Sequence, residues 1–199
     1  MEQILSELSI DTPGEGFIDI TSAIKNWIAN NKIRKGILVL FTKHTSCSLT
    51  INENADPRVL KDLSSYMKAL VPEEGVKPIS GEGERISYKH DDEGVDDMPA
   101  HIRTTLTCSS LSLSINESEL VLGPWQAIYL WEHRYSRHKR HLCLHAIGEV
   151  QKINPSLTSE SDSKLITRAN ASKLNEVVLQ RHNPGAWAED GGNETNVDL

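Results

Sequence analysis

The spacing of apolar residues along the chain predicts two amphipathic helices near the N-terminal end. Apolar residues recur at helical spacing in residues 21–30 and again in residues 57–70. Asp56 followed by Pro57 is typical of a helix start, because aspartate accepts free backbone N–H groups and proline suits the first helical position. Thr21 is the candidate N-cap of the earlier helix, which we expect to be the first element of the chain.

Shorter apolar stretches predict strands. "GILVLFT" (residues 36–42) is continuously apolar, which is typical of a strand buried on both faces. Alternating or β-rich stretches follow at residues 47–53, 110–115, 119–133 and 140–149. A third helix is expected near Pro99, after a polar, glycine-containing loop from 72 to 94. This order favours an α+β domain with a mainly antiparallel sheet.

Composition changes after the last predicted strand and divides the chain. Residues 1–149 carry the strand and helix patterns, whereas residues 150–199 are polar and rich in serine, asparagine and glutamate. The second part is predicted to be a C-terminal extension, partly disordered, with one short helix around residues 171–179. We expect it to be dispensable for folding.

Charge and cysteine content exclude several classes of protein. A formal net charge of -7 does not fit a nucleic-acid binder. No apolar run reaches the roughly 20 residues of a membrane span, and the first residues lack the basic and apolar regions of a secretory signal. Cys47, Cys108 and Cys143 are too few and too far apart for a disulfide framework. A cytoplasmic location is therefore expected.

The first candidate site is "HTSCSLTINENADP" (residues 44–57), a polar stretch directly after the apolar strand. His44, Ser46, Asn52 and Glu53 are its chemically competent residues. An imidazole at the end of a buried strand can point into a cleft, to which Glu53 returns after one further strand. The alternative is structural, because an isolated histidine is often only hydrogen-bonded and Asp56 has a capping role.

The second candidate site is the acidic block "YKHDDEGVDDMPAHI". Asp97 and His101 are four residues apart, so they share a face if both lie in the third helix. With His90 they could hold a divalent cation or serve as acid and base. Alternatively, Asp96 or Asp97 caps the helix and the other acids are solvated, but the block is richer in acids than capping requires.

The third candidate site combines "LGPWQ" with the stretch "WEHRYSRHKRHLCLH", which is dense in arginine, lysine and histidine. Arg137, Lys139 or Arg140 can present cationic donors to a phosphate or carboxylate, and the arginine fork suits both. Trp125 can stack on a flat ring while Gln126 hydrogen-bonds to it. In the plain alternative the basic stretch is a solvated turn and Trp125 belongs to the core.

The three blocks together resemble the YjbQ family, also called UPF0047, whose members are described as secondary thiamine-phosphate synthases. The resemblance runs from about Leu5 to Glu149 and does not cover the extension. It implies a homotrimer of α+β subunits built around a β-sandwich, with a polar, metal-binding site. Cys108, where members often show glycine, and Pro124, where a small residue or threonine is usual, depart from the pattern.

The resemblance also implies an activity and a set of site residues. The activity is a weak transfer that joins hydroxymethylpyrimidine diphosphate to thiazole phosphate and gives thiamine phosphate and pyrophosphate. The implied site residues, matched block by block, are His44, Ser46, Asn52 and Glu53, then His90, Asp97 and His101, and finally Trp125, Gln126 and Arg140.

A metal-dependent transferase acting on small phosphorylated heterocycles is thus the leading hypothesis from sequence. Its candidate metal ligands, a mixed nitrogen and oxygen set, are His44, His90, Asp97 and His101. This set suits Zn²⁺ or another transition metal better than Ca²⁺, and Mg²⁺ is expected to enter with the diphosphate. The alternatives are a trimer that binds a metal or small ligand without turnover, and a metal-dependent phosphoester hydrolase.

Overall fold

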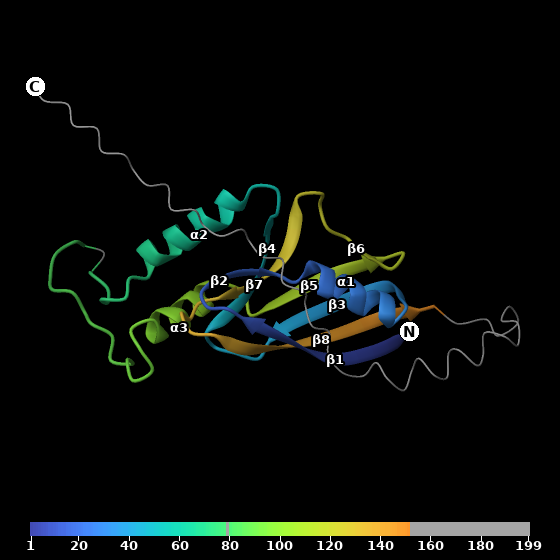
Figure 1. The fold of residues 1–199 in the computed structure, drawn as a ribbon, viewed down its shortest axis with the longest axis horizontal. Helices are drawn as coiled ribbons and strands as arrows, with labels where there is room; N and C mark the ends of the chain where they lie inside the picture. The colour runs from blue at the N-terminus through green and yellow to red at the C-terminus, as the bar shows by residue number, and fades with distance from the viewer. Residues whose placement is uncertain (79, 152–199) are drawn as a thin grey trace, which may run out of the picture. The chain divides into compact units, whose positions relative to one another are not determined.

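Two antiparallel β-sheets and three helices make up the part of the chain that the structure describes, residues 1–78 and 80–151 of a computed structural model (Figure 1). The larger sheet has the order β1-β8-β3-β5-β6 and the smaller the order β2-β7-β4. The strands of the larger sheet are β1 (Glu2–Thr12), β8 (His138–Val150), β3 (Ile33–Thr42), β5 (Ser110–Asn116) and β6 (Glu119–Leu120). Those of the smaller sheet are β2 (Gly16–Asp19), β7 (Gln126–Glu132) and β4 (Cys47–Glu53). The predicted α+β class with antiparallel pairing is confirmed.

The core lies where the two sheets and helix α1 (Thr21–Asn30) pack together. Inward residues of α1, such as Ile24 and Ile28, are fully buried. They belong to one apolar cluster with Leu40 of the larger sheet and Leu130 of the smaller. Alternate residues of each strand supply this cluster, because side chains of a strand point to opposite faces. The result is a sandwich-like core held together by apolar burial.

Strand β3 corrects the prediction of a strand buried on both faces. Leu38 and Leu40 are fully buried, but Ile37 is 55% exposed and Phe41 44% exposed. The outward positions of β3 are apolar, and in the described part of the chain no element covers them. Continuous apolarity therefore marks an exposed apolar face of the sheet here, and the core occupies only one side.

The expectation that the first helix is the first element is wrong, because β1 and β2 precede α1. Strand β1 pairs along its whole length with β8, from Glu2↔Gly148 to Thr12↔His138. Thr21 also does not cap α1 through its side chain; its hydroxyl accepts a hydrogen bond from the backbone N–H of Ile128, 2.9 Å away. Thr21 thus joins α1 to β7.

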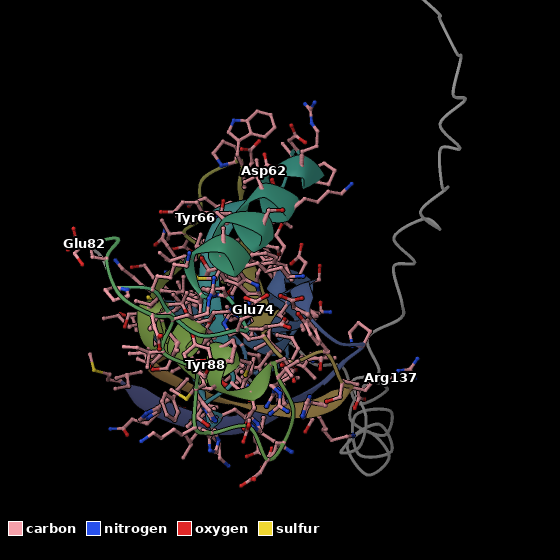
Figure 2. The ribbon with its side chains drawn as sticks, turned by 90° about the vertical axis from the view of Figure 1, so that its left-hand side faces the viewer. Asp62, Tyr66, Glu74, Glu82, Tyr88 and Arg137 are labelled. Atoms are coloured by element: carbon pink, nitrogen blue, oxygen red, sulfur yellow. The ribbon has the colours of Figure 1, made fainter. Side chains whose placement is uncertain are left out.

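The predicted helix of residues 57–70 is α2 (Pro57–Leu70), and its predicted cap is confirmed. The Asp56 carboxylate accepts the backbone N–H of Arg58 at 2.9 Å. No residue of α2 is buried within the described chain, and Asp62 and Tyr66 lie on its outward side (Figure 2). Its apolar stripe is only partly covered.

The loop predicted between 72 and 94 connects α2 to α3 (Asp97–Leu106), which begins two residues before the expected Pro99. Within the loop Val76 and Ile86 form a bridge with N···O distances of 3.0 and 2.8 Å. Gly75 has a φ of 97°, and a Cβ there would lie 2.1 Å from the Ile86 carbonyl oxygen. Only glycine fits this close approach.

The predicted single strand of residues 119–133 is divided into β6 and β7. The extension from residue 152 onward, with its predicted helix and disorder, lies outside the described residues. None of the described helices is both long and apolar enough to cross a membrane.

Candidate metal and ligand site

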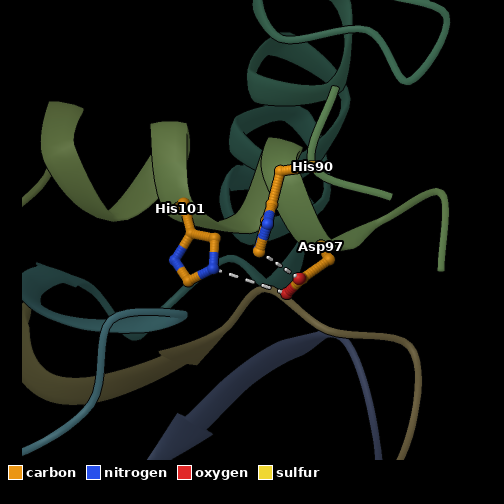
Figure 3. Close-up of side chains that lie close together, drawn as sticks. All are labelled: His90, Asp97 and His101. Carbon is orange, nitrogen blue, oxygen red and sulfur yellow. Dashed lines mark ion pairs between the residues drawn. The ribbon is translucent and has the colours of Figure 1, made fainter. Parts of the chain in front are cut away.

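Three side chains from the acidic block meet at the start of α3. Asp97 and His101 lie one turn apart on the helix, and His90 reaches them from the preceding loop (Figure 3). His90 Nε2 lies 2.8 Å from Asp97 Oδ2, and His101 Nε2 lies 3.6 Å from Asp97 Oδ1. One donor atom from each residue fits within 4.8 Å of the others. The shared face that the sequence predicts for Asp97 and His101 is therefore present.

His101 is oriented by the first polar block. Its Nδ1 donates a hydrogen bond to the backbone carbonyl oxygen of Thr45, 3.0 Å away. Because a carbonyl oxygen only accepts, Nδ1 carries the proton and the neutral ring keeps its lone pair on Nε2. That nitrogen faces Asp97. A backbone hydrogen bond on one ring nitrogen is the usual way to fix a metal-ligating histidine.

Asp97 has one oxygen in use and one without a hydrogen bond. The residue is only 2% exposed, and Oδ1 accepts from the guanidinium of Arg134. Oδ2 is buried and unpaired, although His90 Nε2 is near it, since that contact lacks hydrogen-bonding geometry. A buried carboxylate oxygen in this state costs free energy unless a donor or a cation satisfies it.

Arg134, just beyond the end of β7, holds the acidic block in place. Its Nε donates to Asp96 Oδ2 at 3.0 Å, and Nη2 donates to the backbone carbonyl of Glu93 at 2.8 Å. Burial lowers the pKa of Arg134, but the carboxylates of Asp96 and Asp97 outweigh it and raise that pKa above its ordinary value. Asp96 stands at the N-cap position of α3 as the capping alternative expects, but its side chain makes no capping hydrogen bond and binds Arg134 instead.

A cavity of about 640 Å³ adjoins the cluster at His101. Besides His101, its lining residues are Phe41, Thr42, Lys43, His44, Thr45, Thr104, Thr105 and Ser109. The lining includes hydroxyl groups, two imidazoles and one ammonium group beside the apolar ring of Phe41. The first polar block and the acidic helix thus form two sides of one cavity.

His44 lines this cavity but does not belong to the three-residue cluster. Its Nε2 accepts the backbone N–H of His141 at 2.8 Å, so in the neutral ring the proton sits on Nδ1. Burial, with help from the charge of Arg140, lowers the pKa of His44 below its ordinary value. His44 is accordingly a neutral N–H donor, whereas the sequence predicts a metal ligand.

Arg140 and Ser46 are placed together in the interior. The Arg140 side chain is almost fully buried, with Nε 2.6 Å from Glu132 Oε2 and Nη2 3.0 Å from the Ser46 hydroxyl. Burial raises the pKa of Glu132, yet the bond to Arg140 holds it below its ordinary value. The Arg140 guanidinium is therefore engaged with the internal carboxylate of Glu132, whereas the sequence predicts that Arg137, Lys139 or Arg140 binds a phosphate or carboxylate of a ligand. Arg137 lies in the exposed turn between β7 and β8 (Figure 2).

The remaining predicted residues lie elsewhere. Asn52, Glu53, Trp125 and Gln126 border a second cavity of about 610 Å³. Strands β4 and β7 pair from Cys47↔Glu132 to Glu53↔Gln126, a span of roughly 20 Å at 3.4 Å per residue. This second group is at the far end of the smaller sheet from the histidine cluster. Trp125 is 65% exposed, so the core alternative for it is wrong.

Sequence reasoning missed three consecutive residues, Glu132, His133 and Arg134. All three are buried, and His133 Nε2 lies 2.9 Å from the Ser48 hydroxyl. Burial, aided by the charge of Arg103, lowers the pKa of His133 to about 3. Their signal is the continuation of charged residues directly after the apolar stretch "AIYLW". Such a pattern indicates internal ion pairs at the end of a buried strand.

The fold and the cluster define an α+β protein with a His–Asp site beside a cavity. A family model described as "UPF0047 protein YjbQ-like" matches residues 6–149. The chain therefore belongs to the UPF0047 family, and the predicted resemblance is confirmed.

Relatives and solved structures agree with this assignment. A UPF0047 protein from Synechocystis is 42% identical over 72% of this chain and 90% of its own length. UPF0047 protein YjbQ from Escherichia coli is 36% identical over 71% of this chain and 96% of its own. An uncharacterised YjbQ/UPF0047 protein from Clostridium acetobutylicum has a TM-score of 0.60 and 34% identity, covering 71% of this chain and 99% of its own. These names give a family and no activity.

Proposed function

We propose that this protein is a metal-dependent enzyme that acts on a small phosphorylated heterocycle, with its metal held by His90, Asp97 and His101. The proposed reaction is the transfer that gives thiamine phosphate and pyrophosphate, which is the activity the sequence resemblance implies. One observation supports the proposal of a metal. Asp97 Oδ2 is buried, makes no hydrogen bond and lies near Nε2 of His90. A cation between these atoms satisfies the carboxylate.

The donor set fits a transition metal. Two ligands of a tetrahedral Zn²⁺ lie roughly 3.3 to 3.5 Å apart. In the cluster His90 Nε2 lies 2.8 Å from Asp97 Oδ2, and one donor atom from each of the three residues lies within 4.8 Å of the others. His101 already has its outer nitrogen fixed by Thr45, so Nε2 needs no rearrangement. With His90, Asp97 and His101 as its three protein ligands, a bound Zn²⁺ would keep a position open for a substrate or water, as in catalytic zinc sites.

The residues of the cavity account for binding and orientation. In the proposed complex the Nδ1–H of His44 and the hydroxyl of Ser109 donate to the oxygens of the substrate. Lys43, whose ammonium pairs with Glu7 at 2.6 Å, adds positive charge at the same rim. A divalent cation, when bound, would neutralise the negative charge that develops on the departing pyrophosphate. Holding both reactants in place is the larger contribution of the chain.

The transfer is chemically balanced without an added oxidant or reductant. The bond between the pyrimidine methylene carbon and the diphosphate oxygen breaks, and pyrophosphate leaves with the electron pair. The thiazole nitrogen forms the new bond to that carbon. Trp125 and Gln126 lie at the far end of the smaller sheet, so in this proposal they join the histidine site only from a neighbouring subunit.

The proposal is tested by incubating the protein, reconstituted with Zn²⁺, with both thiamine precursors and Mg²⁺. Thiamine phosphate should appear with the wild type and with Asp92→Asn, an exposed acid of the same block. Asp97→Asn should lose the activity, because the amide removes the anionic metal ligand. Equal activity of both variants would refute the assignment of the site.

Hydrolysis is a second candidate, favoured by the open coordination position that can take a water molecule. Phosphate release from either precursor alone, lost in Asp97→Asn, would identify a phosphoester hydrolase. Metal binding with neither product would identify a binding protein without turnover. The three outcomes exclude one another in a single set of assays.

A further inference from the structure

We propose that Arg134 is the positioning residue of the His90–Asp97–His101 cluster, an assignment that rests on the metal site proposed above. Among the hydrogen bonds and ion pairs of the described residues, none joins Arg134 to His90 or His101. Its role would be to set the direction of the Asp97 carboxylate and the place of the loop that carries His90. Three separate contacts support this role.

The first contact fixes the carboxylate. Arg134 Nη1 donates to Asp97 Oδ1, the oxygen near His101, which leaves Oδ2 without a hydrogen bond and directed at His90. A carboxylate with one oxygen engaged by a guanidinium cannot turn freely about its Cβ–Cγ bond. Asp97 is thereby prepared to offer one defined oxygen, the arrangement that a single-oxygen metal ligand requires.

The second contact fixes the loop. Arg134 Nη2 donates to the backbone carbonyl of Glu93 at 2.8 Å, three residues after His90. Gly94 is then tied to α3, because its carbonyl accepts the backbone N–H of Asp97 at 3.1 Å. The His90 side chain is 52% exposed, so its own packing holds it weakly. Its approach to Asp97 therefore depends on backbone that Arg134 anchors.

The third contact fixes Arg134 itself. Nε donates to Asp96 Oδ2 at 3.0 Å, and the same oxygen accepts the backbone N–H of Tyr135 at 2.8 Å. The guanidinium is planar, so engagement of Nε orients Nη1 and Nη2 as well. A lysine at position 134 would keep the charge but has a single nitrogen at the end of a flexible side chain. It cannot hydrogen-bond to Glu93, Asp96 and Asp97 in the same geometry.

A purely structural role would look different in experiment. Arg134 joins the end of β7 to α3, so its loss lowers stability whether or not it positions a metal ligand. Arg103 is a matched control, because it is also a buried arginine, paired with Glu15 at 3.1 Å and with the Val71 carbonyl at 3.2 Å. Among the contacts of the described residues, none joins Arg103 to Asp97. Replacing either arginine should lower thermal stability, but only replacement of Arg134 should lower the affinity for the metal.

The test measures Zn²⁺ affinity by competition with a chelator on the full chain, alongside thermal midpoints. Arg134→Lys should weaken Zn²⁺ binding by about 10- to 100-fold, the usual loss when a group that orients a ligand is replaced. Arg103→Lys should lower the midpoint and leave the affinity within about twofold of the wild type.

Failure of this inference and failure of the proposed function give different results. A wild type that binds Zn²⁺ together with an Arg134→Lys that binds it equally well overturns the positioning role alone. A wild type that takes up no Zn²⁺ overturns the metal site and this role with it. If Arg134→Lys does not fold, Asp96→Asn, which weakens the anchor of the guanidinium, decides by the same readout: reduced affinity supports the role and unchanged affinity overturns it.

Discussion

His101 Nδ1 lies 3.0 Å from the carbonyl oxygen of Thr45, 56 positions earlier in the sequence. This one hydrogen bond joins the polar stretch after β3 to the acidic helix α3. It also turns the second nitrogen of His101 toward Asp97. The first two residues of that stretch, His44 and Thr45, lie along the cavity beside His101, which explains polar residues directly after the apolar strand.

The free energy of unfolding should decrease as the pH is lowered, because of His133. Burial lowers its folded pKa to about 3 from an ordinary value of 6.5, so between these values the unfolded chain binds a proton that the folded chain does not. Stability due to His133 is present above about pH 6.5 and is lost as the pH falls toward 3, by about 1.4 kcal/mol per unit. Urea unfolding at several pH values measures this slope.

His133→Gln is the control for that slope. Its amide can bond to the Ser48 hydroxyl, which now lies 2.9 Å from His133 Nε2, but it does not titrate. Carboxylates such as Glu132 contribute equally to both proteins, so the difference isolates His133. The variant should show a flatter pH dependence between pH 4 and 6, and parallel curves would contradict the buried neutral histidine.

The exposed apolar face of the larger sheet should be the contact surface of a homotrimer, the assembly implied by the family resemblance. Ile37 faces outward beside Ile147, its partner across β3 and β8. Sedimentation of the wild type should give the mass of about three subunits. Ile37→Lys should shift it toward the monomer, because a charge cannot be buried there without a partner.

Ile86→Lys is the matched control for the assembly, since Ile86 is 62% exposed and Ile37 55% exposed. Ile86 lies in the loop between α2 and α3, outside the larger sheet that contains Ile37. It should leave the mass unchanged. A wild type that sediments as a monomer at every concentration would contradict the predicted trimer. An Ile37→Lys variant that remains a trimer would show that the interface lies on another surface.

Truncation after Val150 should leave the folded part intact. The family match ends at residue 149 and β8 ends at Val150, so the described sheet is complete without the extension. Residues 1–150 should give the thermal midpoint of the full chain within about 2 °C. A large drop in the midpoint would show that the extension packs on the core and would contradict its predicted dispensability.

Local signals in the sequence were sufficient for some elements and not for others. The Asp56–Pro57 start of α2 follows from neighbouring residues alone, and it is confirmed. Strand β1 has no such signal, since Ser6 interrupts its apolar alternation and its partner β8 is more than 120 residues away. The same limit explains β3, where sequence shows apolarity but not which side of the strand the chain itself covers.

Only part of the candidate site could likewise be predicted from local sequence signals. Asp97 and His101 could be placed together because a helix fixes their spacing. Arg134 could not, because its partners Glu93 and Asp97 lie 41 and 37 residues away and meet it only through the fold. The separation of Trp125 from the histidines is likewise a property of strand register, which block-by-block resemblance does not contain.

The most direct test of the metal site is the zinc content of the wild type and of His101→Ala, measured by elemental analysis after reconstitution and dialysis. Their melting curves are recorded in parallel. We expect about one Zn²⁺ per wild-type subunit, very little in the variant, and nearly equal midpoints for the metal-free proteins, because His101 is partly exposed and contributes little to the core. A wild type without zinc, or a variant that retains it, would contradict the proposed zinc site. His90, Asp97 and His101 would then have hydrogen-bonding roles only.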